Sequence, residues 1–195
     1  YNLFFEYGYK IYPVEFGANP LQYFPLPIIN KHLDYVFLAS SNGDKQKRYF
    51  KWLSKLVYKY SGFIDGPGWH KMDRWASQPT HKFLYARAKI GINLHIDDSM
   101  DWASELNERT YILAACGVPQ LVDNAKLLPN RFSDESLFVA TNPKEYEELF
   151  EFMLNNPKEC EKRALKALEE VYEKHTTFHR ADGFIQQLKI KKENK

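Results

Sequence analysis

The feature that most constrains the fold is an alternation of short apolar runs with longer amphipathic segments, repeated about five times along the chain. Segments 34–40 and 120–122 are apolar and have the length of a buried strand. Segment 45–60 instead repeats apolar side chains at helical spacing. Strands that are apolar on both faces need cover on both faces, and intervening helices supply it. The sequence therefore predicts an α/β fold: a doubly wound, Rossmann-like parallel sheet of about five strands with helices on both faces.

Segment 105–124 predicts one helix followed by one buried strand. Polar residues fill the first turn, and Gly117 stands where a helix C-cap belongs. The free backbone N–H groups of a helix start favour an anion, and the polar side chains there can bind hydroxyls. The alternative is that these are solvated first-turn residues of an ordinary helix. The candidate ligand contacts in this segment are Glu105, Asn107, Glu108, Arg109 and Thr110.

Two further segments place polar side chains at the same edge of the predicted sheet. Residues 34–60 predict a strand ending at Ser40, a glycine-containing turn and a helix. This is the layout of a phosphate-cradling unit, although the glycines do not form a GxGxxG motif. Residues 89–95 predict the next strand, with Asn93 and His95 at the carboxyl end, where open α/β sheets bind ligands. These three polar residues are therefore candidate contacts; a solvated helix start and a structural histidine are the alternatives.

Local signals also predict helix boundaries and one close contact. Thr80 is expected to cap a helix, as is Asn142, and Pro157 is expected to open another. Gly91 in the middle of a strand implies a close approach of another element. The lysine-rich tail, residues 189–195, predicts a solvated and frayed end.

Three aspartates, Asp97, Asp98 and Asp101, fall in a polar loop over residues 96–103. Carboxylates are preferred ligands of Ca²⁺ and Mg²⁺, but the spacing fits no EF-hand pattern. We expect a solvated loop here and no metal site.

Composition excludes several classes of protein. The net charge of +2 predicts no strong electrostatic attraction to nucleic acid. No run of residues is long and apolar enough to span a membrane. The two cysteines, Cys116 and Cys160, form neither a CxxC pair nor a disulfide framework. A reducing, cytoplasmic location is therefore expected.

Segment 107–111 (NERTY), followed by segment 114–123 (AACGVPQLVD), resembles the donor-domain signature of the group 1 GT-B glycosyltransferases. The closest branch is that of spore-maturation, CgeB-like proteins, and the resemblance extends more loosely over residues 16–188. Residues 66–69 resemble the segment that this family places near the nucleobase; a tight turn capped by a core tryptophan is the alternative. Residues 175–180 (HTTFHR) resemble the closing segment of the family.

The resemblance implies a nucleotide-sugar substrate and roles for particular residues. In the family, a basic residue just inside the helix after the first strand neutralises the donor diphosphate. Arg48 matches that position best and Lys47 second, and a planar guanidinium suits a diphosphate. Arg109 is a further candidate for the diphosphate. An Asn-x-His like that of residues 93–95 lies beside the donor in the family.

One position departs from the family pattern. Family members place a glutamate five residues before the glycine that corresponds to Gly117, and this glutamate holds the donor ribose hydroxyls. Ile112 stands there in this chain. Glu105 or Glu108, one helical turn earlier, is the candidate substitute.

The resemblance also implies a domain organisation. Residues 1–30, rich in aromatics and prolines, are expected to be an arm that corresponds to the family's crossover between domains, or else a surface arm. Residues 31–195 are expected to form the nucleotide-sugar-binding domain with C-terminal helices. A whole acceptor-binding domain would then precede Tyr1, and the general base would come from it.

The function expected is therefore that of a metal-independent glycosyltransferase donor domain, which binds a UDP- or GDP-sugar as substrate without a tightly bound cofactor. Its other partner would be an acceptor glycan or protein. The alternative is a non-catalytic binding or scaffolding module with a degenerate GT-B half-fold. A sugar-nucleotide epimerase of the same layout is a third reading, although its catalytic signatures are not apparent.

Overall fold

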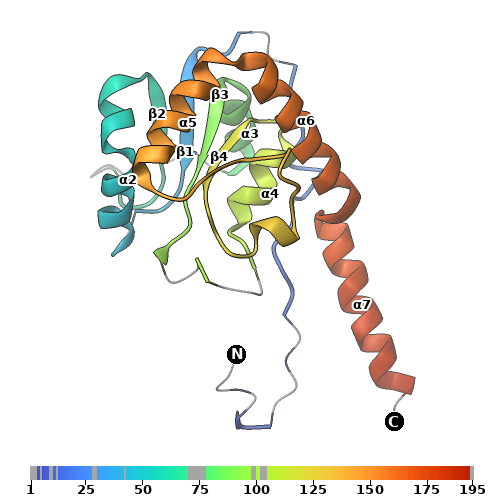
Figure 1. The fold of residues 1–195 in the computed structure, drawn as a ribbon. Coiled ribbons are helices and arrows are strands. Elements are labelled where there is room, and N and C mark those ends of the chain that lie inside the picture. Colours follow the sequence, from blue (N-terminus) through green and yellow to red (C-terminus); the bar gives the residue numbers. More distant parts are fainter. Residues whose placement is uncertain are drawn as a thin grey trace.

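The computed structural model describes residues 4, 6–8, 11, 13–27, 30–41, 43–69, 78–97, 100–101 and 105–193. Within this part of the chain a five-stranded sheet has the order β2-β1-β3-β4-β5, and each neighbouring pair is parallel (Figure 1). The predicted doubly wound parallel sheet is confirmed. The strands are β1 (Leu33–Leu38), β2 (Gly62–Asp65), β3 (Ala88–Asn93), β4 (Gln120–Asp123) and β5 (Phe138–Ala140).

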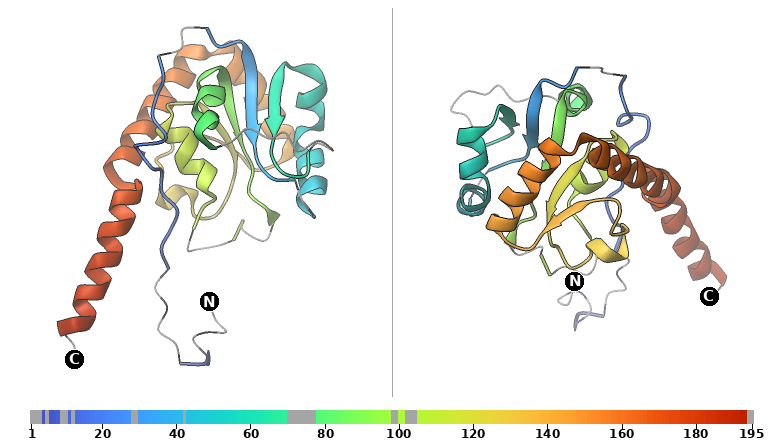
Figure 2. Two further views of the ribbon diagram at one scale, coloured as in Figure 1. Left: turned by 180° about the vertical axis from the view of Figure 1, so that it is seen from behind. Right: turned by 45° about the horizontal axis from the view of Figure 1, so that its top comes forward.

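Helices cover both faces of the sheet (Figure 2). One apolar core lies between the sheet and α2 and α5, and the other between the sheet and α3, α4 and α6. The described helices are α2 (Lys45–Lys59), α3 (Gln78–Ala86), α4 (Glu108–Ala115), the 3-10 turn η2 (Leu128–Asn130), α5 (Pro143–Asn155), α6 (Pro157–Lys174) and α7 (Thr177–Glu193). Among these residues, no helix is both long and apolar enough to cross a membrane.

The strand order places a topological switch point between β1 and β3. From β1 the chain turns to one side to form β2, and then crosses back to form β3 on the other side of β1. The connections that leave β1 and β3 therefore diverge, and open α/β sheets bind their ligands at the carboxyl ends of two strands related in this way. The first turns of α2 and α4 follow at this edge.

Gly91 lets α4 pack closely on β3. A Cβ atom added to Gly91 would lie 2.6 Å from Cδ2 of Leu113 on α4, and Leu113 is fully buried. The close approach predicted from a glycine in mid-strand is confirmed. It brings α4 down onto the sheet, and the start of α4 comes to lie beside the end of β3.

Several predicted boundaries hold, and the predicted start of α3 does not. Asn142 caps α5, because its side-chain oxygen accepts hydrogen bonds from the N–H groups of the first turn, and Pro157 opens α6. The prediction that Thr80 caps a helix is wrong, since α3 begins at Gln78. Proline is tolerated in a first helical turn, so Pro79 does not delay the start. In the lysine-rich tail α7 continues to Glu193, through residues with good helix propensity, and the expectation that this end frays stays a prediction.

The N-terminal arm runs along the C-terminal helices. Ala18 forms an isolated parallel bridge with Thr176, and its N–H donates to the carbonyl oxygen of His175 at 3.0 Å. A Cβ atom on Gly17 would lie 2.9 Å from that same carbonyl oxygen. Ala18 and Tyr23 are buried members of the core. The proposed division of the chain at residue 30 stays a prediction.

Candidate functional site

Arg109 lies at the switch point and bridges the two strands that form it. Its Nε donates to the carbonyl oxygen of Leu38 at the end of β1, at 2.8 Å. Its Nη1 donates to Oδ1 of Asn93 at the end of β3, at 3.1 Å, and to the carbonyl oxygen of Leu94 at 3.4 Å. Its guanidinium also stands 5.0 Å from the ring centre of Phe37. Among the described residues no carboxylate lies within 4.0 Å of Arg109, so its positive charge has no counter-ion there.

Asn93 holds the start of α4 against the end of β3. Its Nδ2 donates to Oγ1 of Thr110 at 2.9 Å and to Oε1 of Gln120 at 2.7 Å. Its Oδ1 accepts from Nδ2 of Asn107 at 2.8 Å and from Arg109. These four bonds use both donors and both acceptor sites of the amide. The side chain of Asn93 therefore positions other residues and has no capacity left for a ligand.

Asn107 sets the start of α4. Its Oδ1 accepts from the backbone N–H of Thr110 at 3.1 Å and from the hydroxyl of the same residue at 3.0 Å. The helix consequently begins at Glu108, and Glu105 precedes it. The expectation that Glu105 lies in the first helical turn is wrong, because a polar residue before a cap resembles one after it in sequence. Burial raises the pKa of the Glu108 carboxyl, and the charge of Arg109 opposes this shift.

Arg48, His95 and Asp123 form a second network beside the first. Nη2 of Arg48 lies 2.7 Å from Oδ2 of Asp123, and Nη1 pairs with the exposed Asp97. Nε of Arg48 donates to the carbonyl oxygen of His95 at 2.7 Å. The Asp123 carboxylate also lies 2.7 Å from Nδ1 of His95 and accepts from the backbone N–H of that residue. The side chains of His95 and Asp123 are both 0% exposed.

The structure brings most of the predicted contacts to one place. Arg109 and Arg48 donate to the consecutive carbonyl groups of Leu94 and His95, so the two networks adjoin at the end of β3. Arg48 nevertheless has both Nη groups engaged by carboxylates, and this leaves little of its charge for a ligand. No polar contact of Glu105 is found within the described part of the chain.

Lys45 is a cation at this edge that the sequence analysis did not select. Its Nζ donates to Oγ of Ser40 at 2.8 Å, across the turn from β1 to α2. Its only polar partner among the described residues is thus a neutral hydroxyl. Lys47 instead lines an apolar hollow of about 660 Å³ between α2 and Trp69. Helical spacing could have shown that the two lysines lie on different faces of α2. Lys45 lies four residues before the buried Tyr49, and residues four apart share one face of a helix.

Two polar residues of β4 were also missed. Asp123 ends β4 and Gln120 begins it, and both are buried. The rule that selected Asn93 and His95, that strand ends face the crevice, applies equally to Asp123.

The ends of β1 and β2 enclose a small cavity of about 160 Å³, lined by residues 38–40, residues 65–67 and His81. Gly66 is required there, because a Cβ atom would lie 2.2 Å from the carbonyl oxygen of Ala39. Trp69 donates from Nε1 to that carbonyl oxygen at 2.6 Å and stacks on Tyr49 with ring centres 5.8 Å apart. Residues 66–69 thus form a tight turn capped by a packed tryptophan.

The aspartate loop gives no sign of a metal centre in its described part. No group of three or more histidine, cysteine or acidic residues among the described residues is arranged to hold a metal ion. Asp98 lies outside the described residues. The expectation that this loop holds no metal therefore stays a prediction.

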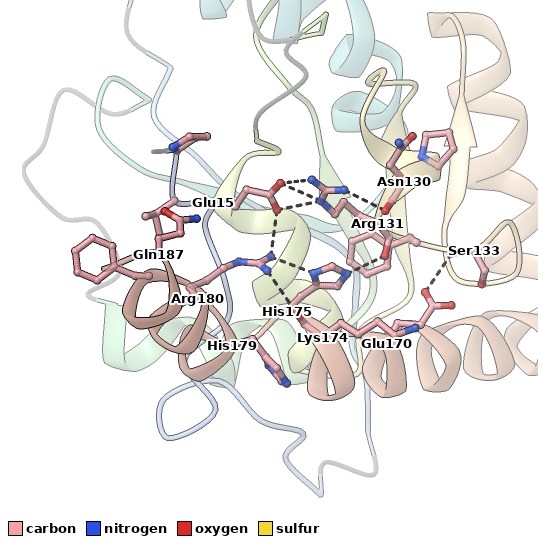
Figure 3. Close-up of a pocket in the computed structure, with 16 residues that line it drawn as sticks. Glu15, Asn130, Arg131, Ser133, Glu170, Lys174, His175, His179, Arg180 and Gln187 are labelled. Carbon is pink, nitrogen blue, oxygen red and sulfur yellow. Dashed lines mark hydrogen bonds and ion pairs between the residues drawn. The ribbon is translucent and has the colours of Figure 1, made fainter. Parts of the chain in front are cut away.

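A second hollow, of about 580 Å³, lies between the arm, η2 and the joint of α6 and α7 (Figure 3). Glu15 of the arm pairs with both Arg131 and Arg180. Arg131 also donates to the carbonyl oxygen of Asn130, and Arg180 to the carbonyl oxygen of Phe16 and to Nδ1 of His175. The N–H groups of both arginines thus already have hydrogen-bond partners within the protein. We name Glu15, Arg131, Arg180 and His175 the arm clasp, since they hold the arm to the C-terminal helices.

The arm clasp contains two groups whose pKa values fall on folding. Burial raises the pKa of the Glu15 carboxyl, but the hydrogen bond and charge of Arg131 and the charge of Arg180 lower it by more. Burial lowers the pKa of His175, and the charges of both arginines act in the same direction against a backbone hydrogen bond to Arg131. Each group therefore binds its proton less readily in the folded state than in the unfolded state.

We expect the domain to lose thermal stability as the pH falls below about 6.5, the ordinary pKa of histidine. Because the folded pKa of His175 is depressed, its contribution is complete above that pH and is lost as the pH falls through the folded value. The contribution of Glu15 is lost in the same direction, below about pH 4.3. Scanning calorimetry between pH 5 and 8 would measure the change, expected to be a few degrees, since about 1 kcal/mol shifts a domain of this size by roughly 2–4 °C.

The variant His175→Gln should flatten this pH dependence, and the exposed His32→Gln should leave it unchanged. Equal pH profiles for wild type and His175→Gln would show that the arm clasp does not titrate as inferred.

Comparison with known proteins links this geometry to one family. The sequence profile of a family described as glycosyl transferase-like matches residues 45–186. The fold is similar to that of sucrose-phosphate synthase from Thermosynechococcus elongatus, with a TM-score of 0.68 and 10% identity over 93% of this chain and 53% of that one. It is also similar to TarM, with a TM-score of 0.61 and 13% identity over 85% of this chain and 36% of that one.

A third structure, the C-terminal domain of a group 1 family glycosyl transferase from Francisella tularensis, has a TM-score of 0.55 and 10% identity over 82% of this chain and 99% of that domain. At these identities the likeness establishes the fold alone. The chain spans about half the length of the sucrose-phosphate synthase structure and about a third of that of TarM. No curated protein sequence matches.

Proposed function

The chain belongs to the glycosyl transferase-like family and has the Rossmann-like fold of a GT-B domain, and from this premise we propose that it binds the diphosphate of a nucleotide sugar at the switch point between β1 and β3. The observation that carries the proposal is Arg109. It is fixed at both strand ends, and it lacks a counter-ion among the described residues. A cation held in this way favours an anionic ligand, because its charge is otherwise uncompensated.

Lys45 is the second cation that we assign to the diphosphate. It lies in the first turn of α2, where the helix dipole also favours negative charge. Its partner, the hydroxyl of Ser40, stands at the end of β1, close to the backbone group that Arg109 contacts. Arg48, which the resemblance implied for this role, instead supports the site through Asp123.

The arrangement suits the departure of a nucleoside diphosphate. Negative charge grows on the leaving diphosphate when the glycosidic bond to the sugar breaks. Arg109 and Lys45 would stabilise that charge from fixed positions, so we propose that a protein-held metal is not required. Glu105 and Glu108 remain candidates for binding hydroxyl groups of the donor. The general base for the acceptor would come from another part of the whole protein.

We also propose the finer family placement that the NERTY segment suggests, in the spore-maturation, CgeB-like branch. The acceptor would be a glycan or a protein. A non-catalytic binding module is the second candidate, because Ile112, where the family has a glutamate, is buried at 6% exposure and offers no polar group to a ribose.

Isothermal titration with UDP, GDP, ADP and their glucose conjugates tests the proposal. At least one nucleotide is expected to bind, with no loss of affinity when EDTA is added, because the protein cations hold the diphosphate. A folded chain that binds none of these nucleotides would refute donor binding. Binding that requires added Mg²⁺ or Mn²⁺ would refute the metal-independent form.

A further inference from the structure

One ring nitrogen of His95 is buried and has no hydrogen-bond partner among the described residues. Nε2 of its ring is fully buried and makes no hydrogen bond within the described part of the chain. Leaving a buried polar atom unpaired is unfavourable, because the atom loses its hydrogen bonds to water and gains none in the protein. Such an atom calls for an explanation, and the usual ones are strain, a catalytic role, or an ordered water or ion.

The surroundings of His95 fix the character of this nitrogen. Nδ1 lies 2.7 Å from Oδ1 of Asp123, and an ionised carboxylate can only accept. Nδ1 therefore carries a hydrogen, and in the tautomer that is protonated at Nδ1 alone Nε2 presents a lone pair. Arg48, itself paired with Asp97, lies 2.7 Å from Oδ2 of the same carboxylate.

The other polar groups near His95 do not change this assignment. Arg109 donates to the carbonyl oxygen of Leu94, and the hydroxyl of Tyr146 donates to the carbonyl oxygen of Leu121 at 3.0 Å. Neither contact involves the imidazole ring. Asn93, the other polar side chain at this strand end, has used all its hydrogen-bonding capacity. His95 thus supplies a spare acceptor one residue after Leu94, whose carbonyl oxygen Arg109 contacts.

We propose that Nε2 of His95 accepts a hydrogen bond from a hydroxyl group of the nucleotide sugar, on either the ribose or the transferred sugar. Asp123 is then a positioning residue that holds the imidazole in the accepting tautomer. An ionised phosphate oxygen cannot take this position, because it and Nε2 are both hydrogen-bond acceptors. The inference rests on the proposed nucleotide-sugar binding and adds a hydroxyl contact to it.

A cycle of protein variants and ligand variants tests the contact. The ligands are the best-binding nucleoside diphosphate from the titration, its 2′-deoxy and 3′-deoxy forms, and the glucose conjugate with and without the sugar 2-hydroxyl. In wild type, removal of the contacted hydroxyl is expected to weaken binding by about 3- to 10-fold, the effect of one hydrogen bond. His95→Phe fills the site without an acceptor, so removal of the same hydroxyl should hardly change the affinity. His95→Gln offers an amide oxygen as acceptor, so removal of the hydroxyl should again weaken binding, although by less than in wild type. The ribose and glucose arms identify the source of the hydroxyl.

The tautomer is measured separately by ¹⁵N NMR of the imidazole in wild type, which also serves if the His95 variants do not fold. Nδ1 is expected to be protonated and Nε2 not, and the Nε2 resonance should move with the intact nucleotide more than with the matching deoxy form. Asp123→Asn should alter the tautomer, and the control Asp97→Asn, which changes a partner of Arg48 and not of His95, should leave it unaltered.

The outcomes separate this inference from the proposed function. If no nucleotide binds to the folded wild type, donor binding itself fails. The hydroxyl contact is refuted, and donor binding stands, if nucleotides bind but every deoxy form binds to wild type as tightly as the intact ligand. The same conclusion follows if nucleotides bind and the NMR spectrum shows that Nε2 carries the hydrogen. A nucleotide-independent Nε2 resonance would mean that an ordered water alone occupies this place.

Discussion

Replacing Arg109 with glutamine is expected to weaken the binding of a nucleoside diphosphate by about 100-fold. The guanidinium is anchored by Leu38 and Asn93, so it needs no rearrangement to meet the ligand. Removing one partner of a buried charged hydrogen bond costs roughly 2–5 kcal/mol, and about 2.8 kcal/mol corresponds to 100-fold. Isothermal titration with the nucleotide that binds wild type best measures the change.

Two matched variants show whether the effect is specific. Arg109→Lys keeps the charge but cannot bond to both strand ends at once, so an intermediate loss is expected. Arg163→Gln removes an arginine of α6 that pairs with Glu159 and donates to the carbonyl oxygen of Leu137, and it should leave affinity unchanged. Circular dichroism confirms that each variant is folded. Wild-type affinity in folded Arg109→Gln would place the diphosphate away from the switch point, or would favour the non-catalytic reading.

The fold could be predicted because its signals are local. The apolar runs that become β1 and β4, and the helical spacing of α2, each depend on a few consecutive residues. Caps such as Asn142 are equally local. The same rule that strand ends face the ligand crevice identified Asn93 and His95, although it was not applied to Asp123.

The roles of the charged residues could not be predicted in the same way. The pairing of Arg48 with Asp123 joins residues 75 positions apart and depends on how α2 and β4 sit on the sheet. Sequence spacing shows a cation near a predicted turn but not the carboxylate that neutralises it. Arg109 was selected for its position at a helix start. Its significance lies in the contacts with Leu38 and Asn93 and in the lack of a counter-ion among the residues that the structure describes.

Arg48→Met is expected to lower the free energy of unfolding by about 3–5 kcal/mol. The substitution keeps an apolar side chain of similar length over Trp52, whose ring centre is 5.0 Å from the guanidinium. It leaves the Asp123 carboxylate, which is 0% exposed, without the cation that compensates it. Breaking a buried ion pair by removing one partner typically has a cost of this size. Urea denaturation of wild type and variant measures the difference.

Asp97→Asn supplies the matched control on the other side of the same guanidinium. The Asp97 side chain is 75% exposed, so its pair with Arg48 is screened by water and should contribute less than about 1 kcal/mol. The double variant Arg48→Met with Asp123→Asn should recover part of the loss, because it no longer buries an unpaired charge. If Arg48→Met costs no more than Asp97→Asn, the pair with Asp123 does not hold the site together. The charge of Arg48 would then be available to a diphosphate, and the donor affinity of Arg48→Met should fall as that of Arg109→Gln does.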